Sequence, residues 1–391
     1  MRVMRILTRP NVGGPTGQAI ALWHAFAQRG VPTLLVTGAT DAAEPMLAPT
    51  EHGVPAMEWQ AALAAGPAAS GWVQLPALQR GIAPFADRAA LVALRKLLAA
   101  HRPDVVHTHT SKAGWIGRRA AVAADVAVVA HTFHGHVLQD YFWRPVSWWL
   151  GQLERRLAER TQLLFAVSPS CADELAAAGV AARQRFVVVP PAVPLAGVLS
   201  RSAARARLQI PPAQRRIVCV GRLVKIKRID HFVALVAALP GMHGDVVGAG
   251  PLRAALQRQV EQVALGRVLC RGVRPGIAAE LSAYDALVLP SVREGCPLVA
   301  IEAFAAGIPV VGYDVPGVRD ALAHWGRGTL VPVSSGPAGL AAAVQAVLAG
   351  TAPDNSAAVG RFAPTAVADQ LLGAYRAALI TSGRYHAPPP G

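Results

Sequence analysis

Two glutamates, Glu294 and Glu302, interrupt the otherwise apolar segment SVREGCPLVAIEAFAAGIPVV, with seven residues between them. Pro297 is typical of the first turn of a helix, and the Gly-Ile-Pro after Ala306 ends one, so we expect a helix from about Pro297 to Ala306. A helix apolar on nearly every side is normally buried, and a buried carboxylate is costly unless something pairs with it. Glu302, the only charge within this helix, therefore needs a partner, and a ligand is a candidate.

Two cations, Arg222 and Lys227, lie in GRLVKIK, directly after the apolar run RIVCV. Two fixed cations on one loop suit a ligand that carries about two negative charges, because such hydrogen bonds are charge-assisted. The alternative is an Arg and a Lys that are merely solvated beside a strand. We favour the ligand role because Arg222 follows the strand's glycine, Gly221, directly.

Glycines follow other apolar runs. RPNVGGPTGQA contains Gly13 and Gly14 before a helix that we expect to begin near Thr16, and GAGPLR contains Gly250. Backbone NH groups at a helix N-terminus can hold a phosphate. A tight connection from strand to helix is the alternative.

These residues need a scaffold, and the sequence predicts two parallel sheets. Short apolar runs alternate with helical Ala/Leu/Arg segments, which indicates sheets covered on both faces. The expected strands are 3–8, 33–37, 104–107, 127–132, 162–167 and 186–189, and then 216–220, 245–248, 267–270, 286–290, 308–312 and 329–333.

The alternation of strands and helices is interrupted at 196–214, which indicates a domain boundary. We therefore expect an N-terminal domain over 1–195 and a C-terminal domain over 196–360. A final helix over 361–385 is expected to cross back to the N-terminal domain. Residues 40–85 carry few strand signals and are left unassigned, and the tail HAPPPG is expected to be disordered. Ligands bind at the carboxyl ends of strands in such sheets, so we expect the candidate residues around a cleft.

Composition narrows the function. The chain has 391 residues, 53% of them hydrophobic, and 38 Lys and Arg against 23 Asp and Glu give +15. That charge can attract nucleic acid, anionic lipid or phosphorylated substrates, but no nucleic-acid motif accompanies it. The four cysteines are far apart, which argues against a zinc site or a disulfide framework. With no spanning segment or signal-peptide pattern, we expect a cytoplasmic protein.

VCVGRLVKIKR and GAGPLR, taken with the glycine-rich opening stretch, resemble the C-terminal domain of family 4 retaining glycosyltransferases. HTHTSKAGWIGRRAA, HTFHGH and LERRLAERTQLLFAVSPSCADEL resemble the N-terminal domain of bacterial members that build surface polysaccharides. The resemblance covers nearly the whole chain. It implies an α/β GT-B fold, in which two Rossmann-like doubly wound domains face a cleft, and a donor that is a nucleoside diphosphate sugar, UDP- or GDP-linked, with no separate cofactor.

The resemblance also implies roles. Arg222 and Lys227 would hold the donor diphosphate, Glu302 would accept hydrogen bonds from the ribose hydroxyls, and Glu294 would lie beside the transferred sugar. The backbone advances on the order of 10 Å between the glutamates, comparable to the reach from hexose to ribose. The backbone around the donor would come from Gly13, Gly14, Gly221, Gly250, Gly295, Cys296, Pro297 and Leu298.

His134 in HTFHGH resembles the histidine that contacts the sugar near the reaction centre, although His107, His109, His131 and His136 are alternatives. The histidine cluster also has metal-like spacing, but no acidic or Cys partner is near it. The chain has no D-x-D motif, which supports a reaction without a metal, in which the Arg/Lys pair takes the metal's place.

On the acceptor side, His109, Lys112 and Arg118 are candidates, the two cations for an acceptor phosphate, with an ordinary helix surface as the alternative. Relatives that glycosylate polyprenyl-diphosphate-linked acceptors suggest such an acceptor. Aromatic and basic residues mix in segment 136–160, which suits contact with an anionic membrane surface but also a core helix.

Two departures from the family pattern concern donor details and interdomain geometry. Lys227-Arg228 stands where the family usually has Lys-Gly, and Pro191-Ala192-Val193-Pro194 replaces the common Asn-Gly-Val-Asp. Two rival functions are a nucleotide-sugar epimerase of the same fold and a non-catalytic basic module that binds lipid or nucleic acid.

Overall fold

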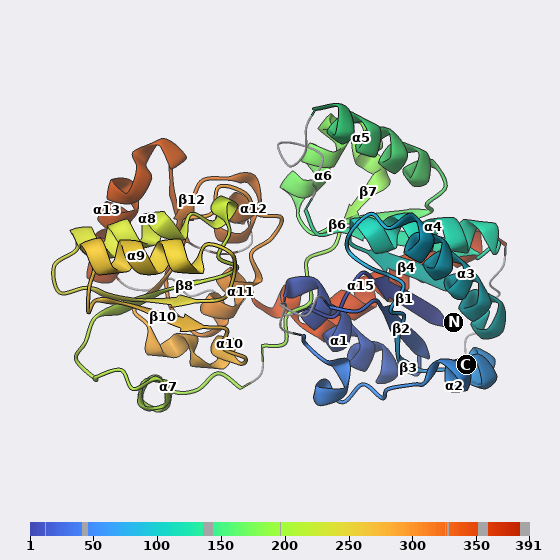
Figure 1. Ribbon diagram of the computed structural model, residues 1–391, viewed down its shortest axis with the longest axis horizontal. Coiled ribbons are helices and arrows are strands. Elements are labelled where there is room, and N and C mark those ends of the chain that lie inside the picture. The colour runs from blue at the N-terminus through green and yellow to red at the C-terminus, as the bar shows by residue number, and fades with distance from the viewer. Residues whose placement is uncertain are drawn as a thin grey trace. The chain divides into compact units, whose positions relative to one another are not determined.

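The computed structural model describes residues 1–11, 13–40, 46–135, 144–195, 197–324, 326, 328–350 and 359–383, with backbone alone at 144–147 and 324. The chain forms two compact units, Met1–Pro194 with Ala363–Gly391, and Leu195–Phe362 (Figure 1). The last helix therefore belongs to the first unit, although it follows the second in sequence.

The first unit is built on one parallel sheet in the order β3-β2-β1-β4-β5-β6-β7. β1 is buried along its whole length, as expected for a strand covered on both faces. The strands are β1 (Val3–Leu7), β2 (Thr33–Thr37), β3 (Gly71–Gln74), β4 (Val105–His109), β5 (Val128–Phe133), β6 (Leu163–Ala166) and β7 (Phe186–Val188).

Two hydrophobic clusters cover the two faces of this sheet. Because side chains alternate along a strand, Val3 packs with α1 and α15, and Met4 packs with α3 and α4. The helices of this unit are α1 (Gly14–Ala27), α2 (Trp59–Ala65), α3 (Pro84–His101), α4 (Ser111–Ala123), α5 (Arg144–Glu159), α6 (Pro169–Ala177) and α15 (Pro364–Thr381).

The second unit repeats the plan with a parallel sheet in the order β10-β9-β8-β11-β12-β13. Its strands are β8 (Arg216–Val220), β9 (His243–Val247), β10 (Val268–Gly272), β11 (Ala286–Leu289), β12 (Val310–Tyr313) and β13 (Thr329–Val331). Its helices are α7 (Arg201–Leu208), α8 (Ile229–Ala238), α9 (Arg253–Val263), α10 (Ile277–Glu280), α11 (Leu298–Ala305), α12 (Pro316–Arg319) and α13 (Gly336–Ala349).

The structure differs from the sequence-based expectations in several places. The unassigned region 40–85 contains α2 and β3, an edge strand of only four residues. α1 begins at Gly14 rather than near Thr16, because Pro15 is accommodated in its first turn. α7 lies within 196–214, where the strand rhythm breaks. The tail and residues 136–143 of the aromatic segment lie outside the described residues.

In both sheets the order reverses at one point, between β1 and β4 in the first unit and between β8 and β11 in the second. The connections on either side of such a point diverge to opposite faces of the sheet. They leave a crevice at the carboxyl ends of the two central strands, where ligands bind in open α/β sheets. The two switch points therefore indicate where each unit's site residues should be sought.

Candidate active site

The loops after β8 and β11 meet at the switch point of the second unit. The backbone NH of Val292 donates to the carbonyl oxygen of Ile226 over 2.9 Å, which ties the two loops together. Lys225–Lys227 form a single 3-10 turn. This turn and the Glu294 loop are thus held side by side, as the sequence predicted for the residues that follow these strands.

Lys227 forms an ion pair with Glu294 across these loops. Both side chains are mostly buried, with 19% of Lys227 and 10% of Glu294 exposed. The Lys227 stem also passes Gly221, where an added Cβ would lie 3.7 Å from its Cδ and Cε. Two candidate residues from distant parts of the sequence are therefore in direct contact.

Arg222 lies on the loop after β8, and its side chain is exposed. No side chain among the described residues forms an ion pair or hydrogen bond with its guanidinium. An exposed cation beside a mostly neutralised one leaves a net positive charge on this loop. Arg222 is thus available to an anionic ligand.

Gly248 and Gly250 allow the neighbouring loop to lie against the Arg222 loop. A Cβ on Gly248 would overlap the carbonyl oxygen of Gly221, and one on Gly250 would lie 2.5 Å from that of Leu223. Leu223 also donates its backbone NH to the carbonyl of Ala249 over 2.9 Å. Close backbone packing therefore explains Gly250 without a ligand.

α11 carries Glu302 and begins at Leu298, with Pro297 as its N-cap residue, one position later than expected. Glu302 is partly buried, and no described residue pairs with its carboxylate. Burial raises the pKa of Glu302 from 4.5 to about 7. No described residue thus supplies the partner that we expected for the Glu302 carboxylate. A ligand therefore stays the candidate partner.

Gly295 and Cys296 lie in the loop that leads to α11, and both are partly exposed. Gly317 of α12 packs against this loop, because an added Cβ would lie 2.6 Å from the Gly295 carbonyl oxygen. Sequence reasoning missed Gly317. A Pro-Gly at the start of a short helix, after a buried strand, is the signal that could have indicated it.

In the first unit, His109 ends β4 and His134 follows β5, so both lie at the carboxyl edge of the sheet. The Nδ1 atom of His109 lies 3.1 Å from the Nε2 atom of His134. The Nε2 atom of His109 lies 2.9 Å from the Nη2 atom of Arg5. His109 is buried between them. We therefore withdraw His109 from the acceptor side.

Arg5 is the residue of this cluster that sequence reasoning missed. It is buried in β1, in the otherwise apolar run VMRIL. A single charge inside an apolar run is the signal that singled out Glu302, and it could have found Arg5 as well.

Lys112 and Arg118 are engaged inside the first unit. Lys112 Nζ lies 2.6 Å from Asp87 Oδ2, and Arg118 Nη2 lies 2.6 Å from Glu154 Oε2, with the Arg118 side chain fully buried. Both cations hold helices together, so contact with an acceptor phosphate would require breaking buried ion pairs. We remove both from the acceptor site, in favour of the structural alternative.

Gly13 is the N-cap residue of α1 and Gly14 its first residue, so the glycine-rich turn does open a helix. The carbonyl of Gly13 accepts from the NH of Gly17 over 3.2 Å. No side chain among the described residues caps this N-terminus, which leaves backbone NH groups available to a ligand.

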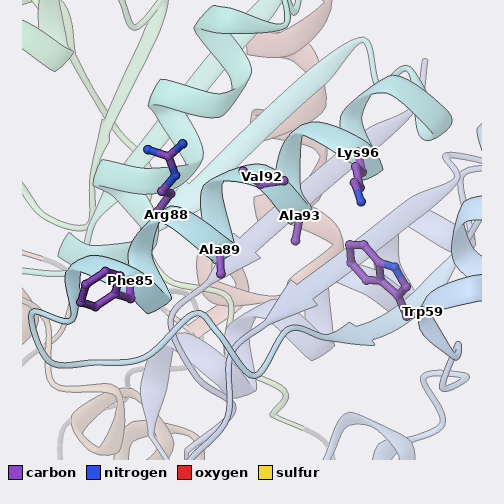
Figure 2. A pocket seen from close by; sticks show the side chains of 7 residues that line it. All are labelled: Trp59, Phe85, Arg88, Ala89, Val92, Ala93 and Lys96. Atoms are coloured by element: carbon purple, nitrogen blue, oxygen red, sulfur yellow. The ribbon is translucent and has the colours of Figure 1, made fainter.

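A surface depression lies on α2 and α3, in the first unit (Figure 2). It is lined by Trp59, Phe85, Arg88, Ala89, Val92, Ala93 and Lys96. It holds no carboxylate or histidine and none of the candidate residues, so we assign it no part in the chemistry at the two switch points.

Two kinds of feature are absent from the described ranges. No three His, Cys, Asp or Glu side chains there are grouped so that they could hold a metal ion. No helix of the described chain combines the length and the apolar character needed to span a membrane.

Comparison with known proteins gives two family matches. Residues 12–196 match the family described as Glycosyltransferase Family 4, and residues 214–350 match the family described as Glycosyl transferases group 1. The matches fall on the first and second units respectively.

Two curated relatives are similar over much of the chain. The UDP-Gal:alpha-D-GlcNAc-diphosphoundecaprenol alpha-1,3-galactosyltransferase of Escherichia coli is 30% identical over 62% of this chain and 66% of its own length. The D-inositol 3-phosphate glycosyltransferase of Geodermatophilus obscurus is 30% identical over 94% of this chain and 85% of its own length.

Among solved structures, Anabaena HepE in complex with UDP and glucose has a similar fold. The TM-score is 0.75 at 18% identity, and the match covers 96% of this chain and 100% of that one.

Proposed function

Because this chain belongs to glycosyltransferase family 4, we propose that it transfers a sugar from a UDP- or GDP-linked donor to a hydroxyl group of a lipid-linked glycan. The configuration at the anomeric carbon is retained. The observation that carries the proposal is Glu302, a partly buried carboxyl without a described protein partner, on the helix that follows the Glu294 loop. A diol such as ribose is the kind of partner that this group lacks.

The donor lies at the switch point of the second unit. Its ribose hydroxyls donate to Glu302, and its diphosphate lies against Arg222 and Lys227. Glu294 contacts the transferred sugar, and the free backbone NH groups at the start of α11 bind hydroxyl or phosphate oxygens. The ion pair between Lys227 and Glu294 supports this arrangement, since it already holds the phosphate-binding and sugar-binding loops together.

Transfer occurs on the face from which the leaving group departs. The bond between the anomeric carbon and the diphosphate oxygen breaks while the acceptor hydroxyl oxygen bonds to that carbon. The hydroxyl proton passes to an oxygen of the departing diphosphate. Arg222 and Lys227 stabilise the charge that develops there, so they bind the transition state more strongly than the ground state.

The donor and acceptor classes rest on similarity. The E. coli relative is named for a UDP-linked sugar and a diphosphoundecaprenol acceptor, and HepE was solved with UDP and glucose. A lipid-linked acceptor would bring the enzyme to the inner face of the cell membrane as a peripheral protein.

Described residues of the aromatic segment support the membrane contact. Trp148 and Trp149 on α5 are 67% and 54% exposed, in a helix that also carries Arg155 and Arg156. A helix that carries both exposed tryptophans and cations is suited to the interface of an anionic bilayer.

Thermal unfolding in the presence of nucleotides tests the proposal, because a ligand that binds only the native state raises the midpoint. UDP, GDP, ADP and CMP are compared at millimolar concentration, with their sugars. We expect one of UDP and GDP to raise the midpoint by several degrees, and Glu302→Ala to abolish the shift. Glu261→Ala, an exposed glutamate on α9, is the matched control and should retain it.

The absence of a shift with every nucleotide would contradict the proposed donor class. A shift that survives in Glu302→Ala would leave nucleotide binding standing but would exclude the ribose contact.

A further inference from the structure

Arg5 is a buried cation without a counterion. It is 1% exposed, and no described carboxylate pairs with it. Its Nε and Nη1 atoms are buried without a hydrogen-bond partner, and its guanidinium lies 5.7 Å from the centre of the Phe26 ring. Burying a charge without a counterion lowers the stability of the folded protein. The one side-chain hydrogen bond it makes, to His109, is therefore where a compensating role should be sought.

The direction of that hydrogen bond is unambiguous. A guanidinium has only donors, so Nε2 of His109 must accept from Arg5 over 2.9 Å. A neutral imidazole carries one proton, so the proton of His109 is on Nδ1. Nδ1 lies 3.1 Å from Nε2 of His134 and donates to it.

The same logic then applies to His134. Its Nε2 atom accepts, so its proton is on Nδ1. No described residue accepts from this Nδ1–H, and His134 is partly exposed at the edge of the sheet. Gly135, which follows it, is exposed and has φ of +111°. His134 thus has an N–H donor without an acceptor among the described residues.

The charge states agree with this arrangement. Burial lowers the pKa of Arg5 to about 10, so Arg5 stays charged at neutral pH. Burial, followed by the charge of Arg5, lowers the pKa of His134 to about 3. Burial, His107 and Arg5 lower the pKa of His109 well below its ordinary value. Both histidines are therefore neutral at physiological pH.

We propose that Arg5 and His109 are positioning residues that fix His134 in its Nδ1–H tautomer, so that His134 donates a hydrogen bond to an oxygen atom of the bound sugar substrate. The substrate in this statement rests on the proposed function, whereas the tautomer does not. In water the neutral histidine side chain carries its proton mainly on Nε2. The buried arginine therefore selects the less common form and transmits that selection through His109.

Nitrogen NMR of the protein labelled with ¹⁵N-histidine reports the tautomer directly, without a ligand, and His134→Gln assigns the signal. We expect Nδ1–H for His134 in the native protein. Arg5→Met, which keeps the apolar volume, and His109→Leu should both shift it toward Nε2–H. His109→Gln should preserve it, because a glutamine amide can accept from Arg5 and donate to His134.

His131→Leu is the matched control. His131 is a histidine of the same sheet, 2% exposed like His109, but it is bonded to Thr108 and not to His134. It should leave the His134 tautomer unchanged. Nε2–H in the native protein, or the same tautomer in Arg5→Met and His109→Leu as in the native protein, would overturn the proposal.

Steady-state kinetics with the donor identified by thermal unfolding test the substrate contact. His109→Leu should lower kcat/KM by about tenfold, the effect of one hydrogen bond, while His131→Leu does not. An equal loss in both variants would assign His109 a merely structural role. Failure of both UDP and GDP to bind would count against the proposed donor, and the NMR result would still decide the tautomer.

Discussion

Lys227 and Glu294 form an ion pair although 67 positions separate them in sequence. The pair joins the loop after β8 to the loop after β11, which are adjacent because β8 and β11 are neighbours at the point where the strand order reverses. Without a donor, each charge largely neutralises the other. In the proposed function, a diphosphate would share the Lys227 ammonium with a carboxylate that is already bound to it.

Replacement of Lys227 by alanine should lower kcat by about 10²-fold, because one donor to the departing charge is lost. Lys225→Ala is the matched control, since Lys225 is exposed in the same 3-10 turn. It should change kcat by less than about twofold. Steady-state kinetics with the donor identified by thermal unfolding measure both. Equal effects of the two substitutions would mean that the loop's overall charge matters and not the position of Lys227.

Glu302→Gln should stabilise the protein at high pH. The pKa of Glu302 is raised to about 7 in the folded state from 4.5, so the folded state holds this proton more tightly than the unfolded chain. The destabilisation is absent below pH 4.5, grows between 4.5 and 7, and is complete above 7, where it reaches about 3 kcal/mol at most. Urea unfolding should show the variant more stable at pH 8 and equal near pH 4.5. A stability difference independent of pH would contradict this origin.

Nucleotide binding should release protons near pH 7. Ribose hydroxyls that donate to Glu302 stabilise its carboxylate and lower its pKa, so part of the proton held at pH 7 leaves on binding. Calorimetry in two buffers with different enthalpies of ionisation should give a fraction of a proton released per UDP or GDP bound. Glu302→Gln should abolish that component, and a release that persists in the variant would have to come from another group.

Gly317→Ala should weaken donor binding although Gly317 lies outside the proposed contacts. The added methyl group would lie 2.6 Å from the Gly295 carbonyl oxygen and would displace the loop that carries Glu294. We expect an increase of about tenfold in the Kd of UDP or GDP. Gly373→Ala, in α15, is the control, since nothing lies within 4 Å of the added atom. It should raise stability by about 1 kcal/mol, as Ala favours a helix over Gly. An unchanged Kd for Gly317→Ala would mean that the loop tolerates the shift.

Trp148→Ser with Trp149→Ser should weaken binding to vesicles of phosphatidylglycerol and phosphatidylcholine. The loss follows from apolar area that no longer enters the interface. Leu265→Ser removes another exposed apolar side chain, in the second unit, and serves as the control in sedimentation assays. Retention of full binding by the tryptophan variant would exclude this part of α5 as the contact.

The sequence alone was sufficient for the fold class and for many of the strands. Two parallel sheets follow from short apolar runs that alternate with helical segments, because a strand buried on both faces must be apolar along its length. The GT-B class followed from the resemblance to family 4 glycosyltransferases, and it is confirmed. β2 and β8 have the predicted bounds. β3 was not predicted, since a four-residue edge strand with glycine at its start carries little periodicity.

Sequence by itself also singled out Glu294, Glu302, Arg222 and Lys227. A charge within an apolar run, or on the loop after a buried strand, destabilises the fold unless it is paired, so a ligand-binding role is a natural explanation. Which candidates are engaged with the protein was decided by the tertiary structure alone. Lys112 and Arg118 look like free cations in sequence, but partners 25 and 36 positions away neutralise them. Arg5 reaches His109 across 104 positions. Local patterns specify which residue types occur and which elements they form, whereas the charge and hydrogen-bonding state of a side chain depends on neighbours that only the packing of distant strands and helices brings within about 3 Å.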